Sequence, residues 1–169
     1  RIFCAALETD FSHSRLINPR IDLSRIISVG MNVMLEVSPF TIENKRLQLP
    51  ANMRFSDDKL RMIQLFSFAQ QHQLDIHPDS FRRLTRAVRA AATEDLQSDE
   101  TKQLFLGIIT SKHSSERVLR LMNEAGWLGK FLPDFGRIVG MMQFDMYHSY
   151  TVDEHTIRAL GTLNEIEQG

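Results

Sequence analysis

Beyond residue 55 the chain repeats one pattern: apolar residues return every three to four positions, in segments that each open on a helix-capping residue. Between Leu60 and Ala69 the apolar positions cover most of a helix circumference, which predicts a central, buried helix beginning at Ser56. Further helices are predicted to begin at Pro78, Ser98, Ser114 or Ser115, Pro133 and Thr151. The last of these opens on a capping box and extends to about Gln168. The helix from Pro133 is predicted to turn Phe135, Ile138, Val139 and Met142 inward.

A different pattern precedes these helices. From Val33 to Leu49, apolar and polar residues alternate around a polar tip at Glu43–Lys45, where Asn44 is the residue most tolerant of a left-handed turn. This pattern predicts a short β-hairpin, which must lie against helices because a lone hairpin is marginally stable in water. A weaker helical pattern covers residues 2–16. The predicted fold class is mainly α: a helix bundle with a small N-terminal β-hairpin element.

The size and composition limit what such a fold can do. With 169 residues, 43% hydrophobic and 24% charged, the chain has enough apolar material for one globular domain, or one and a half. The net charge of −1 disfavours nucleic acid as a partner. The single cysteine, Cys4, provides neither a disulfide framework nor a cysteine zinc site and suits a cytoplasmic protein. No apolar run approaches the ~20 residues of a membrane span, so no membrane association is expected.

The chain begins at Arg1 rather than at a methionine, and it ends at Gly169 directly after a helical pattern. We therefore expect it to be a segment of a longer protein.

Several catalytic signatures are absent from the sequence. It contains no P-loop, no D-x-D pair for a nucleotide-transferring metal clamp, no H-E-x-x-H, and no histidine followed directly by aspartate. No nucleophile elbow marks a serine hydrolase. The sequence therefore predicts no complete catalytic site and no cofactor within the segment itself.

Two surface features have both a functional and a structural interpretation. An arginine stripe, with Arg83 and Arg61 nearby, consists of Arg82, Arg86 and Arg89. It could hold a phosphate or an acidic partner, or it could be a solvated helix face paired with neighbouring acids. The methionine-rich and aromatic stretch from Met141 to Tyr150 could form an adaptable binding groove, or it could fill a seam between two subdomains.

His155 lies in the first turn or so of the last predicted helix. It shares a side of that helix with Ala159, Leu163 and Ile166, which predicts an imidazole that points toward an interior. There it could be a hydrogen-bonded core residue or a metal ligand projecting from a helix. One ligand is not a site, because a hydrolytic metal centre needs at least three protein ligands.

Two long blocks of the sequence resemble bacterial PII-protein uridylyltransferases. The first extends from Leu121 to Ile138 and reads LMNEAGWLGKFLPDFGRI; the second extends from Met142 to Thr156 and reads MQFDMYHSYTVDEHT. Shorter stretches at residues 3–8 and 74–78 are similar to the family in the same order. The resemblance covers nearly the whole chain and is strongest from about residue 55 onward.

This resemblance implies a segment of a bifunctional enzyme that adds UMP from UTP to the PII signal protein and removes it again. Its transferase domain would precede the segment, an HD-type hydrolase domain would follow, and C-terminal repeats would sense glutamine. The implied divisions are an N-terminal helix and hairpin at 1–54, a helical linker domain at 55–145, and the first helix of an incomplete HD domain at 146–169. His155 occupies the place of the first metal-ligand histidine of the HD domain, which in the whole enzyme would hold a divalent metal, Mg²⁺ or Mn²⁺. The transferase elements and the remaining HD ligands are missing, so the segment by itself is expected to be inactive.

The resulting prediction is a connecting helical domain that holds the transferase and hydrolase domains at a fixed separation. The rival interpretation is a free-standing helical module for protein–protein interaction, which would dock through the arginine stripe or the methionine-rich stretch. A complete small metal hydrolase is a third interpretation, against which the missing His-Asp doublet argues.

Overall fold

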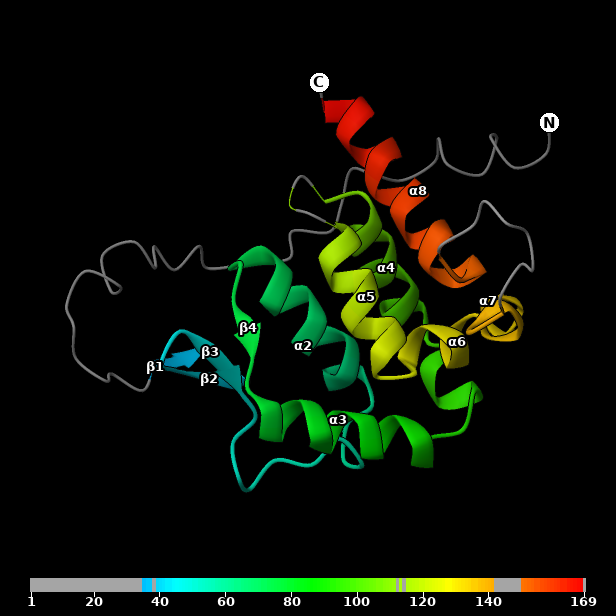
Figure 1. Cartoon of the computed structure of the whole chain (residues 1–169). Coiled ribbons are helices and arrows are strands. Elements are labelled where there is room, and N and C mark those ends of the chain that lie inside the picture. Colours follow the sequence, from blue (N-terminus) through cyan, green and yellow to red (C-terminus); the bar gives the residue numbers. More distant parts are fainter. Residues whose placement is uncertain (1–34, 38, 112, 114, 142–149, 169) are drawn as a thin grey trace. The chain divides into compact units, whose positions relative to one another are not determined.

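The small sheet at the start of the chain confirms the predicted hairpin and extends it. The computed structural model of the chain describes residues 35–37, 39–111, 113, 115–141 and 150–168. Its strands are β1 (Leu35–Val37), β2 (Phe40–Glu43), β3 (Arg46–Gln48) and β4 (Asp75–Ile76). They lie in the order β1-β2-β3-β4, with antiparallel pairing from β1 to β3 (Figure 1). Asn44 and Lys45 form the turn with φ angles of 50° and 61°, so both residues adopt the left-handed conformation expected of Asn44.

The fourth strand was not predicted. β4 pairs in parallel with β3 although 26 or more residues separate them in sequence, and the backbone N–H of His77 donates to the carbonyl of Leu47 at 2.9 Å. Two residues are too few for an alternating pattern to be recognised. The pairing ties the sheet to the beginning of the helix that follows β4.

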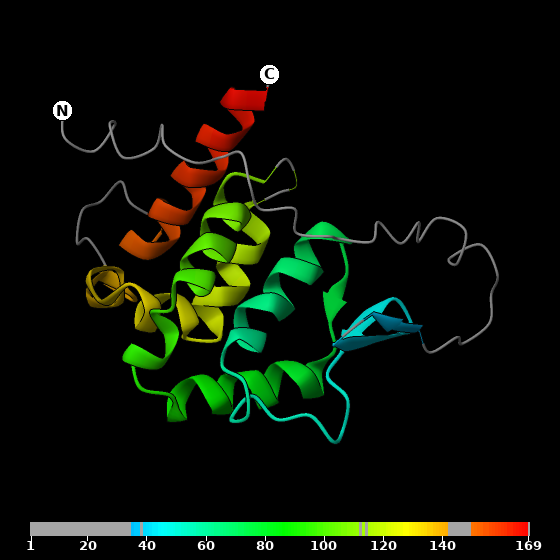
Figure 2. The same ribbon diagram turned by 180° about the vertical axis from the view of Figure 1, so that it is seen from behind.

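Helices make up most of the described residues and confirm the mainly α prediction. They are α2 (Leu60–Gln71), α3 (Pro78–Ala90), α4 (Asp99–Ile109), α5 (Ser115–Glu124), α6 (Trp127–Phe131), α7 (Pro133–Ile138) and α8 (Val152–Gln168), with a 3₁₀ turn η1 (Glu94–Leu96). Figures 1 and 2 show α2, α4 and α5 side by side, with α3 crossing below their ends. The predicted helix at residues 2–16 and most of the Met141–Tyr150 stretch lie outside the described residues.

The central position predicted for the first of these helices is confirmed. In α2 the side chains of Met62, Ile63, Leu65 and Phe66 are completely buried. The predicted start at Ser56 is wrong, because α2 begins at Leu60 and the carboxylate of Asp58 accepts the Leu60 backbone N–H at 3.0 Å. Ser98, by contrast, caps α4 as predicted, since its hydroxyl accepts the backbone N–H of Thr101 at 3.2 Å.

The core is organised around the only tryptophan. Trp127 is fully buried and stacks on Phe131 with ring centroids 4.6 Å apart. Phe105 of α4 and Phe66 of α2 approach the indole at 6.0 and 6.5 Å. The chain reaches this position through Gly126, whose φ of 76° ends α5 in the left-handed conformation that glycine adopts without cost.

Side chains from distant segments satisfy the carbonyl groups at the ends of three helices. The Lys130 ammonium donates to Val88 at 2.6 Å, to Arg89 at 3.0 Å and also to Ala91 at the end of α3. The amide of Gln70 donates to Ile108 of α4 at 3.0 Å, and that of Gln97 donates to Phe131 of α6 at 2.8 Å. Each such bond fixes one helix end to another element, which favours a stiff assembly.

The predicted helix from Pro133 exists but is short and buries little. α7 ends at Ile138, Phe135 and Ile138 are only half-buried, and Val139, predicted to face inward, is 43% exposed. Met142, placed on the same face, lies outside the described residues. A tight approach holds α7 against α6, because a Cβ at Gly136 would lie 2.6 Å from the Gly129 carbonyl oxygen. Close contact between two short helices therefore replaces the predicted apolar face.

Candidate functional site

His155 lies in the first turn of α8, as predicted, but on an exposed part of the helix. The prediction that its side of α8 faces an interior is wrong within the described structure: Ala159 is exposed, Leu163 is 60% exposed and Ile166 is 71% exposed. The buried positions of α8 are Asp153, Ile157 and Gly161, each four residues apart. α8 therefore packs through a neighbouring face and presents the stripe that contains His155 outward.

The helix that α8 packs against is α5, and the two lie side by side in both views (Figures 1 and 2). Ile157, with no exposed surface, is the apolar centre of this contact. We call this contact the α5–α8 junction. It consists of Glu116, Arg120 and Asn123 of α5 and Asp153, Glu154, Ile157 and Gly161 of α8.

Asp153 fixes the beginning of α8 at the junction. One carboxylate oxygen accepts the Asn123 amide at 2.7 Å, and the other accepts the Gly140 backbone N–H at 3.1 Å. Burial by itself raises the pKa of Asp153, but hydrogen bonds from Thr151, Asn123 and Gly140 outweigh it and hold the pKa below its ordinary value. The ionised carboxylate thus joins α5, the segment that follows α7, and α8 at one point, two residues before His155.

An ion-pair network lies beside Asp153. The Arg120 guanidinium of α5 donates to the Glu154 carboxylate from Nε at 3.0 Å, and it also pairs with Glu116 at 2.7 Å. Arg158 approaches Glu154 at 3.6 Å. The hydrogen bond to Glu154 is the main reason that the pKa of Arg120 is raised. Because these groups are partly exposed, the network contributes more to orienting the helices than to their stability.

The second half of α8 comes close to α5 at Gly161. A Cβ on Gly161 would lie 2.8 Å from the Glu116 carboxylate and 3.0 Å from its Cβ. One turn later the Asn164 amide donates to the Ser111 carbonyl at 2.9 Å and to the Ser115 hydroxyl at 3.2 Å. α8 is therefore held on α5 along three turns.

Gly161 gives a direct test of this close approach. Alanine is favoured over glycine by about 1 kcal/mol inside a helix, but an added methyl group in a packed contact costs about 1–3 kcal/mol. Gly161→Ala is therefore expected to lower the free energy of unfolding measured in urea. The matched change Gly107→Ala, at an exposed α4 position with nothing within 4 Å of its Cβ, is expected to raise it. Equal gains in the two variants would contradict the close approach.

The described residues by themselves do not fit a metal ion. Within the parts of the chain that the structure places, no three His, Cys, Asp or Glu side chains lie close enough to share one. A metal site that included His155 would therefore need its other ligands from outside these residues.

The arginine stripe forms as predicted. Arg82, Arg86 and Arg89 all lie on the exposed side of α3, and Arg82 pairs with Asp79. Of the methionine-rich stretch, Met141 and Tyr150 are described and exposed; the Arg158 guanidinium lies 4.1 Å above the Tyr150 ring.

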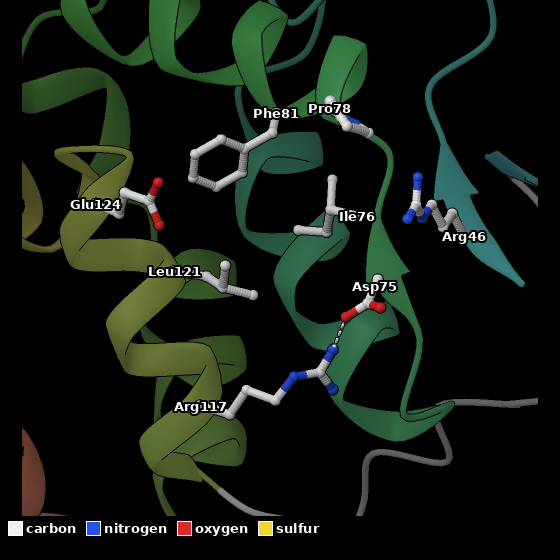
Figure 3. Close-up of a pocket in the computed structure, with 8 residues that line it drawn as sticks. All are labelled: Arg46, Asp75, Ile76, Pro78, Phe81, Arg117, Leu121 and Glu124. Carbon is white, nitrogen blue, oxygen red and sulfur yellow. Dashed lines mark hydrogen bonds and ion pairs between the residues drawn. The ribbon is translucent and has the colours of Figure 1, made fainter.

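One hollow that sequence reasoning missed lies between β4 and α5 (Figure 3). Its volume is about 350 Å³, and it is lined by Arg46, Asp75, Ile76, Pro78, Phe81, Arg117, Leu121 and Glu124. Ile76, Phe81 and Leu121 point into it, and the Arg117–Asp75 ion pair lies across one end (Figure 3). Four separate elements contribute these residues, so no local sequence motif could have predicted the hollow.

The sequence analysis also did not identify the contacts of the α5–α8 junction, although the two blocks that resemble the family contain Asn123, Asp153 and Glu154. Asn123 and Arg120 read as ordinary polar positions of an amphipathic helix. Gly161 was the available signal, because a glycine inside a helix costs stability unless a neighbour comes close.

Among the described residues, no helix has the length and apolar content needed to cross a membrane.

Comparison with known proteins identifies the family to which the chain is similar. The family described as "Uridylyltransferase GlnD third domain" matches residues 40–131, from the second strand to the end of α6. The bifunctional uridylyltransferase/uridylyl-removing enzyme of Azospirillum brasilense is 43% identical over all 169 residues, and that of Novosphingobium aromaticivorans is 48% identical over 137 residues. The aligned regions span 18% and 15% of those two proteins. The chain therefore belongs to the uridylyltransferase GlnD family, as a segment that includes its third domain.

Proposed function

We propose that the chain is the connecting helical domain of a bifunctional uridylyltransferase/uridylyl-removing enzyme, and that it fixes the position of the helix carrying His155. The α5–α8 junction is the observation that supports this role. Three turns of α8 are attached to α5 by Ile157, by the Asp153 hydrogen bonds and by the close approach at Gly161. The capped ends of α3, α4 and α6 make the body behind the junction stiff.

In this proposal α8 opens the hydrolase domain. His155 supplies one ligand to a divalent metal, Mg²⁺ or Mn²⁺, whose other ligands lie outside the described residues; when bound, such a metal polarises the scissile phosphate bond and activates water. Residues 55–145 form the linker domain, and residues 146–169 begin the hydrolase domain. The exposed stripe that contains His155, Leu163 and Ile166 faces the rest of that domain, which accounts for its apolar exposure.

The proposed substrates follow from the same assignment. They are UTP and the PII signal protein, with glutamine as the regulating ligand, and the proposed compartment is the cytoplasm. The segment itself has no catalytic role beyond placing His155.

The test uses a chimeric enzyme in which this chain replaces the aligned segment of the A. brasilense relative. Leucine at position 161 keeps the helix propensity high but cannot fit against Glu116, so Gly161→Leu displaces α8. Because a misplacement of ~1 Å can cost ~100-fold in rate, uridylyl removal is expected to fall at least about tenfold.

The matched control is Gly107→Leu, which adds the same side chain to an exposed helix position with open space around it. It is expected to leave uridylyl removal within about twofold of the unchanged chimera. A Gly161→Leu chimera with normal removal activity would contradict the positioning role.

A further inference from the structure

The exposed side of α3 carries more positive charge than its surroundings neutralise. The arginine stripe of Arg82, Arg86 and Arg89 forms a surface that we call the arginine face. All three residues are exposed, whereas Ser80, Leu84 and Val88 are buried on the opposite side of the helix. The fold therefore uses the buried side of α3 and leaves the arginine face available. α3 lies at the opposite end of the helical assembly from α8, as both views show (Figures 1 and 2).

Only part of this charge has a partner. Arg82 pairs with Asp79, one turn earlier in the helix. Among the ion pairs within the described parts of the chain, none involves Arg86 or Arg89. Two guanidinium groups, each with five donors in a planar fork, thus have no carboxylate there.

A hollow lies beside the arginine face. Its volume is about 380 Å³, and it is lined by Gln48, Leu49, Ala51, Asp79, Ser80, Arg82, Arg83 and Arg86. Arg83 is held in place because its guanidinium donates to the carbonyls of Leu49 at 2.9 Å, Pro50 at 3.1 Å and Met53. These acceptors are neutral, so the charge of Arg83 remains. Three arginines against one aspartate leave the hollow with an excess of two positive charges.

The spacing of the charges indicates what kind of anion fits. The positions 82, 86 and 89 follow each other by about 6 and 4.5 Å along the helix axis, so the face extends beyond the hollow. A compact phosphate would contact only one end of it. A second helix with carboxylates at i, i+4 and i+7 carries charges at the same intervals. Nucleic acid fits less well, because the chain as a whole has a net charge of −1.

We propose that the arginine face and its hollow bind an acidic helical segment of a partner protein, through charge-assisted hydrogen bonds between guanidinium groups and carboxylates. This interaction is separate from the α5–α8 junction and does not depend on the function proposed for it.

The test uses the full 169-residue chain and a synthetic helix-forming peptide of about 15 residues with glutamates at i, i+4 and i+7. Fluorescence anisotropy at low ionic strength is expected to show binding at least about tenfold tighter than that of a peptide with glutamines in those places. The double variant Arg86→Glu/Arg89→Glu is expected to weaken binding of the glutamate peptide at least about tenfold. Added salt is expected to weaken it as well.

The matched control is Lys102→Glu/Arg137→Glu, which makes the same change in formal charge at exposed positions of α4 and α7. It is expected to weaken binding by less than about threefold. Equal losses in the two double variants would overturn the proposal, and so would equal binding of the two peptides. Tighter binding of UTP or single-stranded DNA, dependent on Arg86 and Arg89, would assign the face to another class of anion. Unchanged thermal unfolding midpoints verify that the variants are folded.

Discussion

Replacing His155 by alanine in the chimeric enzyme is expected to lower uridylyl removal by at least about 100-fold, because loss of partners that merely orient metal ligands already costs about 10–100-fold. The transferase activity is expected to stay within about threefold, since His155 lies on α8 and contributes nothing to nucleotide transfer in the proposed arrangement. The measurement is the rate of each reaction on the same enzyme preparation. The result that the proposal requires is a large loss of uridylyl removal with little loss of nucleotide transfer.

The control for this result is His113→Ala. His113 is also exposed, but it lies between α4 and α5, where its ring nitrogen contacts the Gln73 amide at 3.1 Å. Both activities are expected to survive this change. Uridylyl removal that persists in His155→Ala, with metal content unchanged, would show that His155 is not a ligand.

The second large effect is expected for Trp127→Ala. Truncating a fully buried tryptophan removes the ring contacts with Phe66, Phe105 and Phe131 and costs about 3–5 kcal/mol of the free energy of unfolding. A domain with a total stability of about 5–15 kcal/mol then unfolds at much lower urea concentration. Because Trp127 is the only tryptophan, unfolding is followed by circular dichroism at the helix band rather than by fluorescence.

Two companion variants make this prediction specific. Trp127→Phe is expected to cost less than the alanine change, because the indole N–H has no acceptor in the described structure and only volume is lost. Leu106→Ala, at an α4 position that is 46% exposed, is expected to cost well under 1 kcal/mol. A loss below about 1 kcal/mol for Trp127→Ala would mean that the aromatic cluster is not the centre of the core.

The chemistry of local sequence predicted which helices and strands form better than it predicted where they begin and end. Ser98 and Pro78 mark helix starts correctly because each acts on the first turn that follows it. Ser56 has the same chemistry, yet α2 begins only at Leu60, where the carboxylate of Asp58 accepts the first backbone N–H of the helix. β4 depends on pairing with a distant strand, which no local pattern encodes.

For the candidate site too, the sequence predicted the position of a residue on its helix better than the packing of that helix. The sequence placed His155 near the beginning of the last helix, and the structure agrees. The periodicity of Ala159, Leu163 and Ile166 predicted a buried face, but the structure buries Asp153, Ile157 and Gly161 instead. An apolar stripe shows that a surface needs cover without showing which element supplies it. The partners Asn123 and Arg120 depend on the tertiary contact and could not be predicted from helix periodicity.

Amide hydrogen exchange of α8 in the full 169-residue chain tests the central claim, that the helix carrying His155 is fixed to the bundle, most directly. The account predicts that the amides around Ile157 exchange as slowly as those of α5, and that Gly161→Leu speeds exchange in α8 far more than in α2. Rapid exchange throughout α8 in the unchanged chain, with α5 still protected, would contradict it.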